Sequence, residues 1–143
     1  MNTTHSNFIT VESGHYGRLV VARLKPGEDI IEALETLCSS HAVMRAVVRS
    51  MVGSLVEANL SHGWAQMAQP FTVAGPGVEI LNAFGEVSLD AGTRTSISGM
   101  VADTNGRMYA GCFVPGANRS LVTIEVTLQE WIVETSYREV VAA

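Results

Sequence analysis

Two serines and a cysteine have the spacing that would place them on one face of a β-hairpin. Ser96 and Ser98 lie two residues apart in "TRTSISGM", and Cys112 ends "RMYAGC" after the turn sequence "DTNG". Side chains two residues apart on a strand point to the same face of a sheet. Two hydroxyls and a thiol could bind a small polar ligand. The motif holds no general base, so nucleophilic catalysis is not indicated. Small residues that fill a tight sheet or a subunit interface are the alternative.

The turn sequence of this hairpin allows two registers. A two-residue Asn-Gly turn places Gly99 opposite Cys112. A type I turn with a bulge at Gly106 places Ser98 opposite Cys112, and Ser96 then shares their face. The turn residues alone leave both registers open.

Three further residues are candidate neighbours of such a pocket: His62, Glu79 and Glu125. His62, in "SHGW", follows an expected strand and precedes a loop, and a plain loop position is its alternative. Glu125 alternates with threonines on the polar side of its strand. Its carboxylate is either solvated or, if a neighbouring subunit covers that face, paired with an arginine. The arginines considered for that pair are Arg23, Arg94 and Arg119.

Metal chemistry has little support from the histidines and cysteines. The four histidines form neither His-x-His nor His-Glu-x-x-His. Two cysteines are too few for a disulfide framework or a four-thiolate zinc site. Cys38 lies on the apolar side of an expected helix, which indicates a small core residue. The residues therefore predict no metal and no cofactor.

The elements that would position these residues are mostly strands. The sequence "EDIIEALETLCSSHA" has the apolar spacing of one helix face, with acidic residues at its N-terminal end. About seven strands surround it, among them residues 17–24, 45–55, 78–89 and 121–131, and "VEANLSH" is the expected partner of 45–55. This order predicts a single α+β domain with a mainly antiparallel sheet and a few helices. Residues 1–14 are expected to be a flexible segment and residues 15–138 the domain.

Composition limits the function classes. Charged residues make up 16% of the chain, against about 25% in typical domains, so part of the surface is expected to be covered in an oligomer. The net charge of −5 and the scattered basic residues argue against nucleic-acid binding. No apolar run reaches the length of a membrane span, and "MNTTHSNFIT" lacks the pattern of a secretory signal. We expect a cytoplasmic protein.

Five segments, in this order, resemble the PPC domain (plants and prokaryotes conserved), which also occurs in plant AT-hook nuclear proteins. They are "RLKPGEDIIEALETLCSSHAV", "VRSMVGSLVEANL", "VEILNAFGEV", "VADTNGRMYAGCFVPG" and "VTIEV". The resemblance covers roughly residues 17–131 and implies a homotrimer. In many prokaryotic relatives histidines that ligate a metal, usually zinc, stand at the positions matching Ser96, Ser98 and Cys112. The resemblance thus favours the register that pairs Ser98 with Cys112, and it implies that the metal site is lost.

The leading hypothesis is therefore a homotrimeric assembly and binding module without a metal, whose ligand is a small molecule or another protein. One alternative is DNA binding, as the family label suggests, although the chain lacks the Arg-Gly-Arg-Pro segment of an AT-hook. The other is an enzyme that uses the hairpin pocket between subunits, which the missing general base disfavours.

Overall fold

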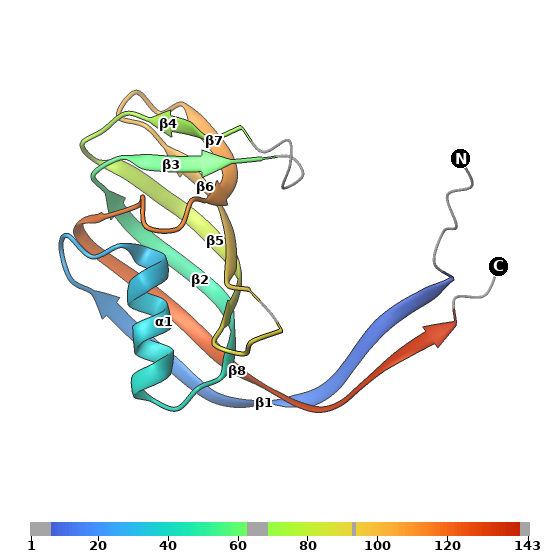
Figure 1. Ribbon diagram of the computed structural model, residues 1–143. Helices are drawn as coiled ribbons and strands as arrows, with labels where there is room; N and C mark the ends of the chain where they lie inside the picture. The colour runs from blue at the N-terminus through green and yellow to red at the C-terminus, as the bar shows by residue number, and fades with distance from the viewer. Residues whose placement is uncertain (1–6, 63–68, 93, 141–143) are drawn as a thin grey trace.

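Eight strands and one helix make up the part of the chain that the computed structural model describes, residues 7–62, 69–92 and 94–140 (Figure 1). The elements are β1 (Phe8–Leu24), α1 (Ile30–Ser40), β2 (Arg45–Leu55), β3 (Ala58–Ser61), β4 (Phe71–Val73), β5 (Val78–Ser88), β6 (Ser96–Ala102), β7 (Met108–Phe113) and β8 (Ser120–Val140). The domain is therefore mainly β, where a mixed α+β domain with about seven strands and a few helices was expected.

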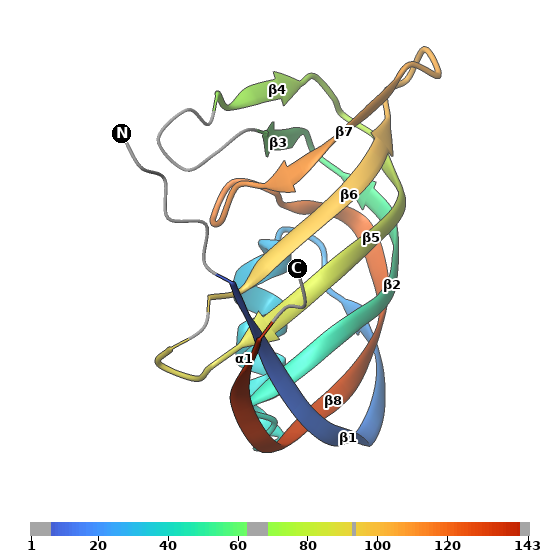
Figure 2. The same cartoon turned by 90° about the vertical axis from the view of Figure 1, so that its right-hand side faces the viewer.

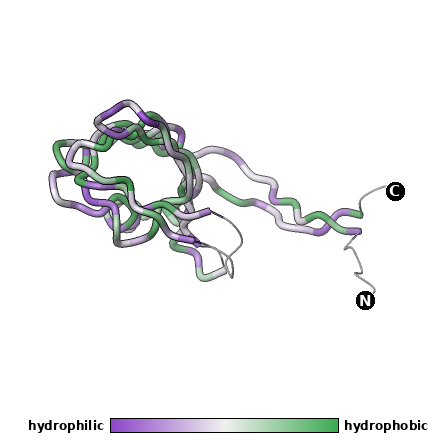
Figure 3. Tube along the Cα trace, turned by 90° about the horizontal axis from the view of Figure 1, so that it is seen from above, coloured by the Kyte–Doolittle hydropathy of each residue, from purple (hydrophilic) through white to green (hydrophobic). Residues whose placement is uncertain are grey.

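All the strands belong to one antiparallel sheet in the order β1-β8-β2-β5-β6-β7-β3-β4. Seen from above, the sheet curls into a ring-like body (Figure 3), and α1 lies along its inner side (Figure 2). Within the described residues, no helix has the length and apolar character that crossing a membrane requires.

The helix forms where the sequence predicts it and covers the inner face of the sheet. Asp29 caps its N-terminus, since the carboxylate accepts a hydrogen bond from the Glu32 N–H at 3.1 Å. The apolar side of the helix is buried through Ile30, Ile31, Leu34 and Cys38. The inner face of the sheet completes the core with alternate residues of its strands, among them Met51, Ile97, Phe113, Ile124 and Leu128.

Two expectations about strand neighbours and faces are wrong. Residues 58–61 do not pair with β2, because β5 and β8 already occupy both of its edges; β3 pairs with β4 and β7 instead. The alternation of residues 121–131 predicts Val122 on the buried face with Ile124, yet Val122 is 58% exposed. It lies where the pairing of β2 with β8 shifts register, between Gly53↔Ile124 and Leu55↔Ser120.

Residues 8–14, which were expected to be flexible, form the first half of β1. They pair with the end of β8, from Phe8↔Val140 to Gly14↔Val133. We call the paired residues 8–13 and 135–140 the arm. This two-stranded ribbon extends away from the body (Figures 1 and 3).

A buried polar cluster joins the helix to the loop before β8 and to β3. The Asn118 amide, fully buried, accepts from the Asn59 N–H at 2.7 Å and donates to the carbonyl oxygens of Asn59 and Val114. The backbone N–H groups of Asn118 and Gly116 donate to the carboxylate of Asp29. Each polar group of the cluster thus has a partner, which buried polar groups require.

The substitution Asn118→Ala should lower the free energy of unfolding by about 1–3 kcal/mol, because it removes the hydrogen-bond partner of the Asn59 N–H and one of the donors to the carbonyl oxygens of Asn59 and Val114. Urea denaturation followed by circular dichroism measures this change. The control is Asn105→Ala, in an exposed turn where the backbone N–H rather than the side chain bonds Asp103; it should change stability by less than about 0.5 kcal/mol. Equal effects of the two substitutions would contradict the role given to the cluster.

Candidate functional site

The β6–β7 hairpin adopts the register with Ser98 opposite Cys112. Asp103 and Arg107 close the turn, with the Asp103 N–H donating to the Arg107 carbonyl oxygen at 2.9 Å. Gly106 takes a φ of 79°, which suits the bulge position of a type I turn. The Asp103 carboxylate accepts two further backbone N–H groups in the loop. Of the two registers that the sequence allows, the bulged one is therefore correct.

The hairpin brings Ser96, Ser98 and Cys112 together on the outer face of the sheet, away from α1. The Ser96 Oγ and the Cys112 Sγ lie 3.9 Å apart, within hydrogen-bond range for sulfur. Ser61 of β3 lies opposite Cys112 on its other side. Ser98 and Cys112 are half-buried and Ser96 is exposed.

Large apolar side chains surround this trio. Phe84 lies opposite Ser98 on β5, and Met100 and Met108 lie farther along the hairpin on the same face. Their side chains remain 60%, 48% and 72% exposed, respectively. Exposed apolar residues that gather around a small polar centre are typical of surfaces that bind another molecule. We call this surface the hairpin face; it is formed by Phe84, Ser96, Ser98, Met100, Met108 and Cys112.

Two charged residues near the trio, Glu86 and Arg45, were not among the residues predicted from the sequence. Glu86 lies opposite Ser96, and its Oε1 accepts a 2.5 Å hydrogen bond from the Arg45 Nε. Arg45 also donates to Glu12 of the arm, at 2.7 Å from Nη1 to Oε2. The hydrogen bond to Glu86, followed by that to Glu12, raises the pKa of the Arg45 guanidinium. Because Glu86 is held by this arginine, it is not a free general base for Cys112.

The three expected pocket neighbours lie elsewhere. The His62 ring packs against that of Phe71 at a tilt of 45°, with ring centroids 4.9 Å apart. It also approaches Gly111, so it lies on the side of the sheet opposite to Cys112. Glu79 shares the outer face but lies opposite Ala102, four residues and about 13 Å along β6 from Ser98.

Glu125 is separated from β6 by β2 and β5, a distance of about 14 Å at ordinary strand spacing. Its Oε1 accepts a hydrogen bond from the Arg23 Nη2 at 2.7 Å, and both side chains are largely exposed. Arg23 was one of the three arginines considered as its partner. Glu125 therefore sits in a surface ion pair, which contributes little to stability.

The donor atoms at the hairpin do not suit zinc. Zinc in proteins takes three or four ligands, mostly thiolate sulfur and imidazole nitrogen, and here two hydroxyls accompany a single thiol. In the described part of the chain no three His, Cys, Asp or Glu side chains cluster as metal ligands would. Two hydroxyls and one thiol therefore do not fit a zinc ion.

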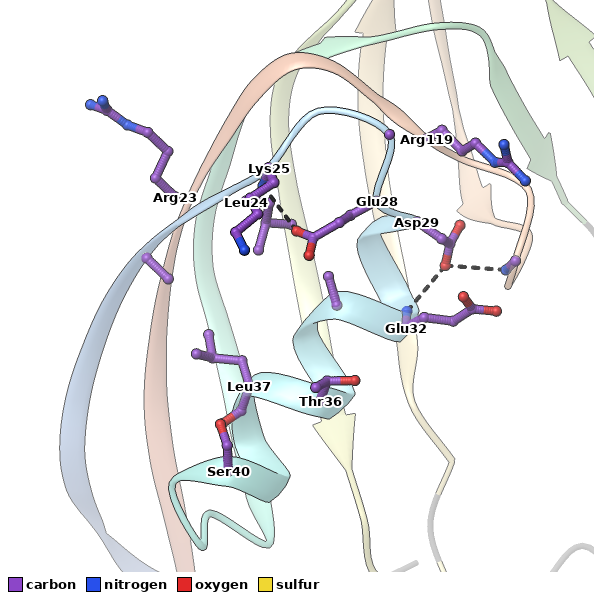
Figure 4. Close-up of a pocket in the computed structure, with 14 residues that line it drawn as sticks. Arg23, Leu24, Lys25, Glu28, Asp29, Glu32, Thr36, Leu37, Ser40 and Arg119 are labelled. Atoms are coloured by element: carbon purple, nitrogen blue, oxygen red, sulfur yellow. Dashed lines mark hydrogen bonds between the residues drawn. The ribbon is translucent and has the colours of Figure 1, made fainter.

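A hollow lies between the end of β1 and α1 (Figure 4). Lys25, Glu28, Glu32 and Arg119 bring charges of both signs to it. The Asp29 carboxylate in its wall is occupied by backbone N–H groups, among them those of Glu32 and Asn118. None of the three hairpin residues lines this hollow.

The sequence profile described as the Plants and Prokaryotes Conserved (PCC) domain matches residues 11–132. The match covers most of the chain, so the protein belongs to this family, the PPC family that its sequence resembles. No match was found among curated proteins.

Solved structures of low sequence identity share the fold. A PPC protein of Pyrococcus horikoshii is 18% identical, with a TM-score of 0.74 over 86% of this chain and 85% of its own. A metal-containing protein of Archaeoglobus fulgidus is 19% identical, with a TM-score of 0.73 over 87% of both chains. A candidate DNA-binding protein of Bacteroides thetaiotaomicron is 15% identical, with a TM-score of 0.68 over 82% of this chain and 83% of its own.

The substitutions Ser96→His and Ser98→His together should create a zinc site, because both side chains would join Cys112 on one face of the hairpin. After dialysis against zinc, mass spectrometry of the metal content should find about one ion per chain in this variant and far less in the natural protein. Adding Cys112→Ser should weaken the new site. Stoichiometric zinc in the natural protein would contradict the poor fit of its donor set.

Proposed function

We propose that the protein is a self-associating PPC-domain module, a homotrimer that binds a small molecule or a protein segment between its copies. The proposal places the binding site at Ser96, Ser98 and Cys112, without a metal, and the protein in the cytoplasm. The observation that carries it is the hairpin face, where small polar groups lie among exposed apolar side chains.

The physical case for assembly rests on uncovered apolar area. Phe84, Met100 and Met108 leave about half or more of their surfaces in water in a single copy. Burying apolar surface contributes about 25 cal/mol per Å², and aromatic and methionine side chains are enriched in protein interfaces. The outer face also exposes Val52 on β2 and Val21 on β1, farther along the sheet from the hairpin, so exposed apolar side chains are not confined to the hairpin face. The low charge content of the chain agrees with a partly covered surface.

The site residues suit recognition better than catalysis. Two hydroxyls and a thiol offer hydrogen bonds of moderate strength, while the nearest carboxylate, Glu86, already binds Arg45. Apolar walls with a few polar groups are typical of small-molecule sites. A second copy placed over the hairpin face would complete such walls around the trio.

The substitution Phe84→Asp should dissociate the trimer, because it places a charge in the apolar part of the proposed interface. Light scattering at micromolar concentration should give about three times the 15.3 kDa of one chain for the natural protein and a mass near one chain for the variant. Val122→Asp, a change at an equally exposed position on the other side of the sheet, should leave the mass unchanged. A monomeric natural protein would overturn the proposal.

Thiol labelling offers a second measure of the same interface. Burial raises the pKa of the Cys38 thiol, so Cys38 should react slowly at every concentration. Cys112 should react readily in dilute protein and more slowly as the copies associate. A Cys112 rate that does not change with concentration, while light scattering shows association, would exclude the hairpin face from the interface.

DNA binding is the second candidate, because two structural relatives, from Bacteroides thetaiotaomicron and Ralstonia eutropha, are named as candidate DNA-binding proteins. The charges of this chain do not favour it. The net charge is −5, and Arg18, Arg23 and Arg45 are each engaged by a glutamate.

We therefore expect no micromolar binding to random duplex DNA at physiological salt, measured by fluorescence anisotropy over a salt titration. Binding that weakens steeply with salt would indicate phosphate contacts and would favour the DNA-binding alternative.

A further inference from the structure

We propose that the arm docks on the hairpin face of a second copy of this chain, so that each candidate site is completed by a neighbour's arm. This inference rests on the proposed assembly and adds which segment of the partner covers the site. The arm was defined above as residues 8–13 and 135–140.

The arm is a two-stranded ribbon, and among the residues that the structure describes no third strand pairs with it. The pairing of β8 with β2 ends at Glu130, and β1 pairs with β8 alone. The paired residues of the arm span about 20 Å along the strands. An isolated two-stranded ribbon is marginally stable in water, so an arm of this length gains stability when its side chains pack against another surface.

Bends at the base of the arm determine its direction. Register shifts interrupt the β1–β8 pairing between Ser13 and Gly14 and between Tyr16 and Leu19, and such bulges bend a strand. A Cβ at Gly14 would overlap the backbone carbonyl of Ile132, and one at Gly17 would overlap the Glu130 side chain. Glycine is therefore required at position 14, where the overlap is with the backbone.

Hydrogen bonds then hold the bent base against the body. Glu12 accepts from the Arg45 Nη1 and, at 3.2 Å, from the Trp131 Nε1. These bonds, that of Arg45 first, lower the pKa of the Glu12 carboxyl. Arg18 donates to Glu130 through its backbone N–H and its guanidinium. A projection held by so many specific contacts is a defined part of the fold.

The end of the arm carries apolar side chains that its own body does not cover. Ile9, Tyr137 and Val140 are 50%, 49% and 67% exposed, respectively. Ile9 shares a ribbon face with Val11, Tyr137 and Glu139, by the alternation of the strands and the pairings Ile9↔Glu139 and Val11↔Tyr137. Its three apolar side chains match the apolar character of Phe84, Met100 and Met108 on the hairpin face.

The geometry favours a second copy as the occupant. The arm extends away from its own body in two perpendicular views (Figures 1 and 3), so the hairpin face within its reach is that of another copy. An arm and a face are different surfaces, and contacts between unlike surfaces are head-to-tail contacts, which form a ring when the rotation between copies closes. A ring of three is the assembly proposed above.

The arm also lies mostly outside the family domain. The family match ends at residues 11 and 132, whereas the arm strands continue to Phe8 and Val140. The docking of the arm is therefore inferred from this chain's own residues rather than from the shared domain.

The test compares two double substitutions that add the same charge to the arm. Ile9→Asp with Tyr137→Asp should weaken self-association at least tenfold in sedimentation equilibrium, because charges replace the docking side chains. Thr10→Asp with Ser136→Asp, at polar positions on the opposite face of the same ribbon, should change it less than twofold. Circular dichroism and the melting temperature verify that both variants keep their fold.

The outcomes separate this inference from the assembly on which it rests. If the natural protein is a trimer and both variants associate equally well, the arm inference is wrong and the proposed function stands. If the natural protein is monomeric, both are wrong.

Crosslinking keeps the inference testable without disturbing the interface charge. The photoreactive residue p-benzoylphenylalanine in place of Tyr137, in a mixture of light and isotope-labelled chains, should crosslink to peptides of the other chain that carry Phe84, Met100 or Met108. Crosslinks confined to the same chain, or to another region of the partner, would overturn the inference.

Discussion

The fold depends on one buried polar contact, the carboxylate of Asp29 with the loop that carries Asn118. Asp29 caps α1 and accepts backbone N–H groups of Gly116 and Asn118. The Asn118 amide in turn fixes Asn59 at the start of β3. Since β3 then pairs with β7 beside Cys112, a capping contact on the inner side of the sheet determines which strand borders the hairpin face on its outer side. The core therefore positions a site that it does not touch.

The hairpin trio could be predicted because its geometry is local. The type I turn with Gly106 as its bulge decides the register, and strand alternation then places Ser96 and Ser98 beside Cys112. The inward position of His62 could not be predicted in this way. It depends on β3 pairing with β7, a contact between segments about fifty residues apart, for which the sequence carries no turn signal. The ion pairs of Arg45 likewise join three strands that are distant in sequence.

The N-terminal residues show a second limit of sequence patterns. Residues 8–14 look flexible because their polar and apolar side chains follow no single buried face. They form a strand because the opposite end of the chain, 119 to 132 residues away, supplies the backbone partners. The glycines at positions 14 and 17 were the available signal: two glycines in a β-prone segment suggest bends in a continuing strand.

The pairing of Phe8 with Val140 places the two ends of the described chain side by side. Ends that meet in this way tolerate rearrangement of the connectivity. The strand order of the sheet would survive if a short linker joined the ends and the chain were opened instead at the exposed Asn105–Gly106 turn. The strand order around the helix therefore defines this domain. The position of the chain termini decides only whether the arm ends in two free termini or in a closed loop.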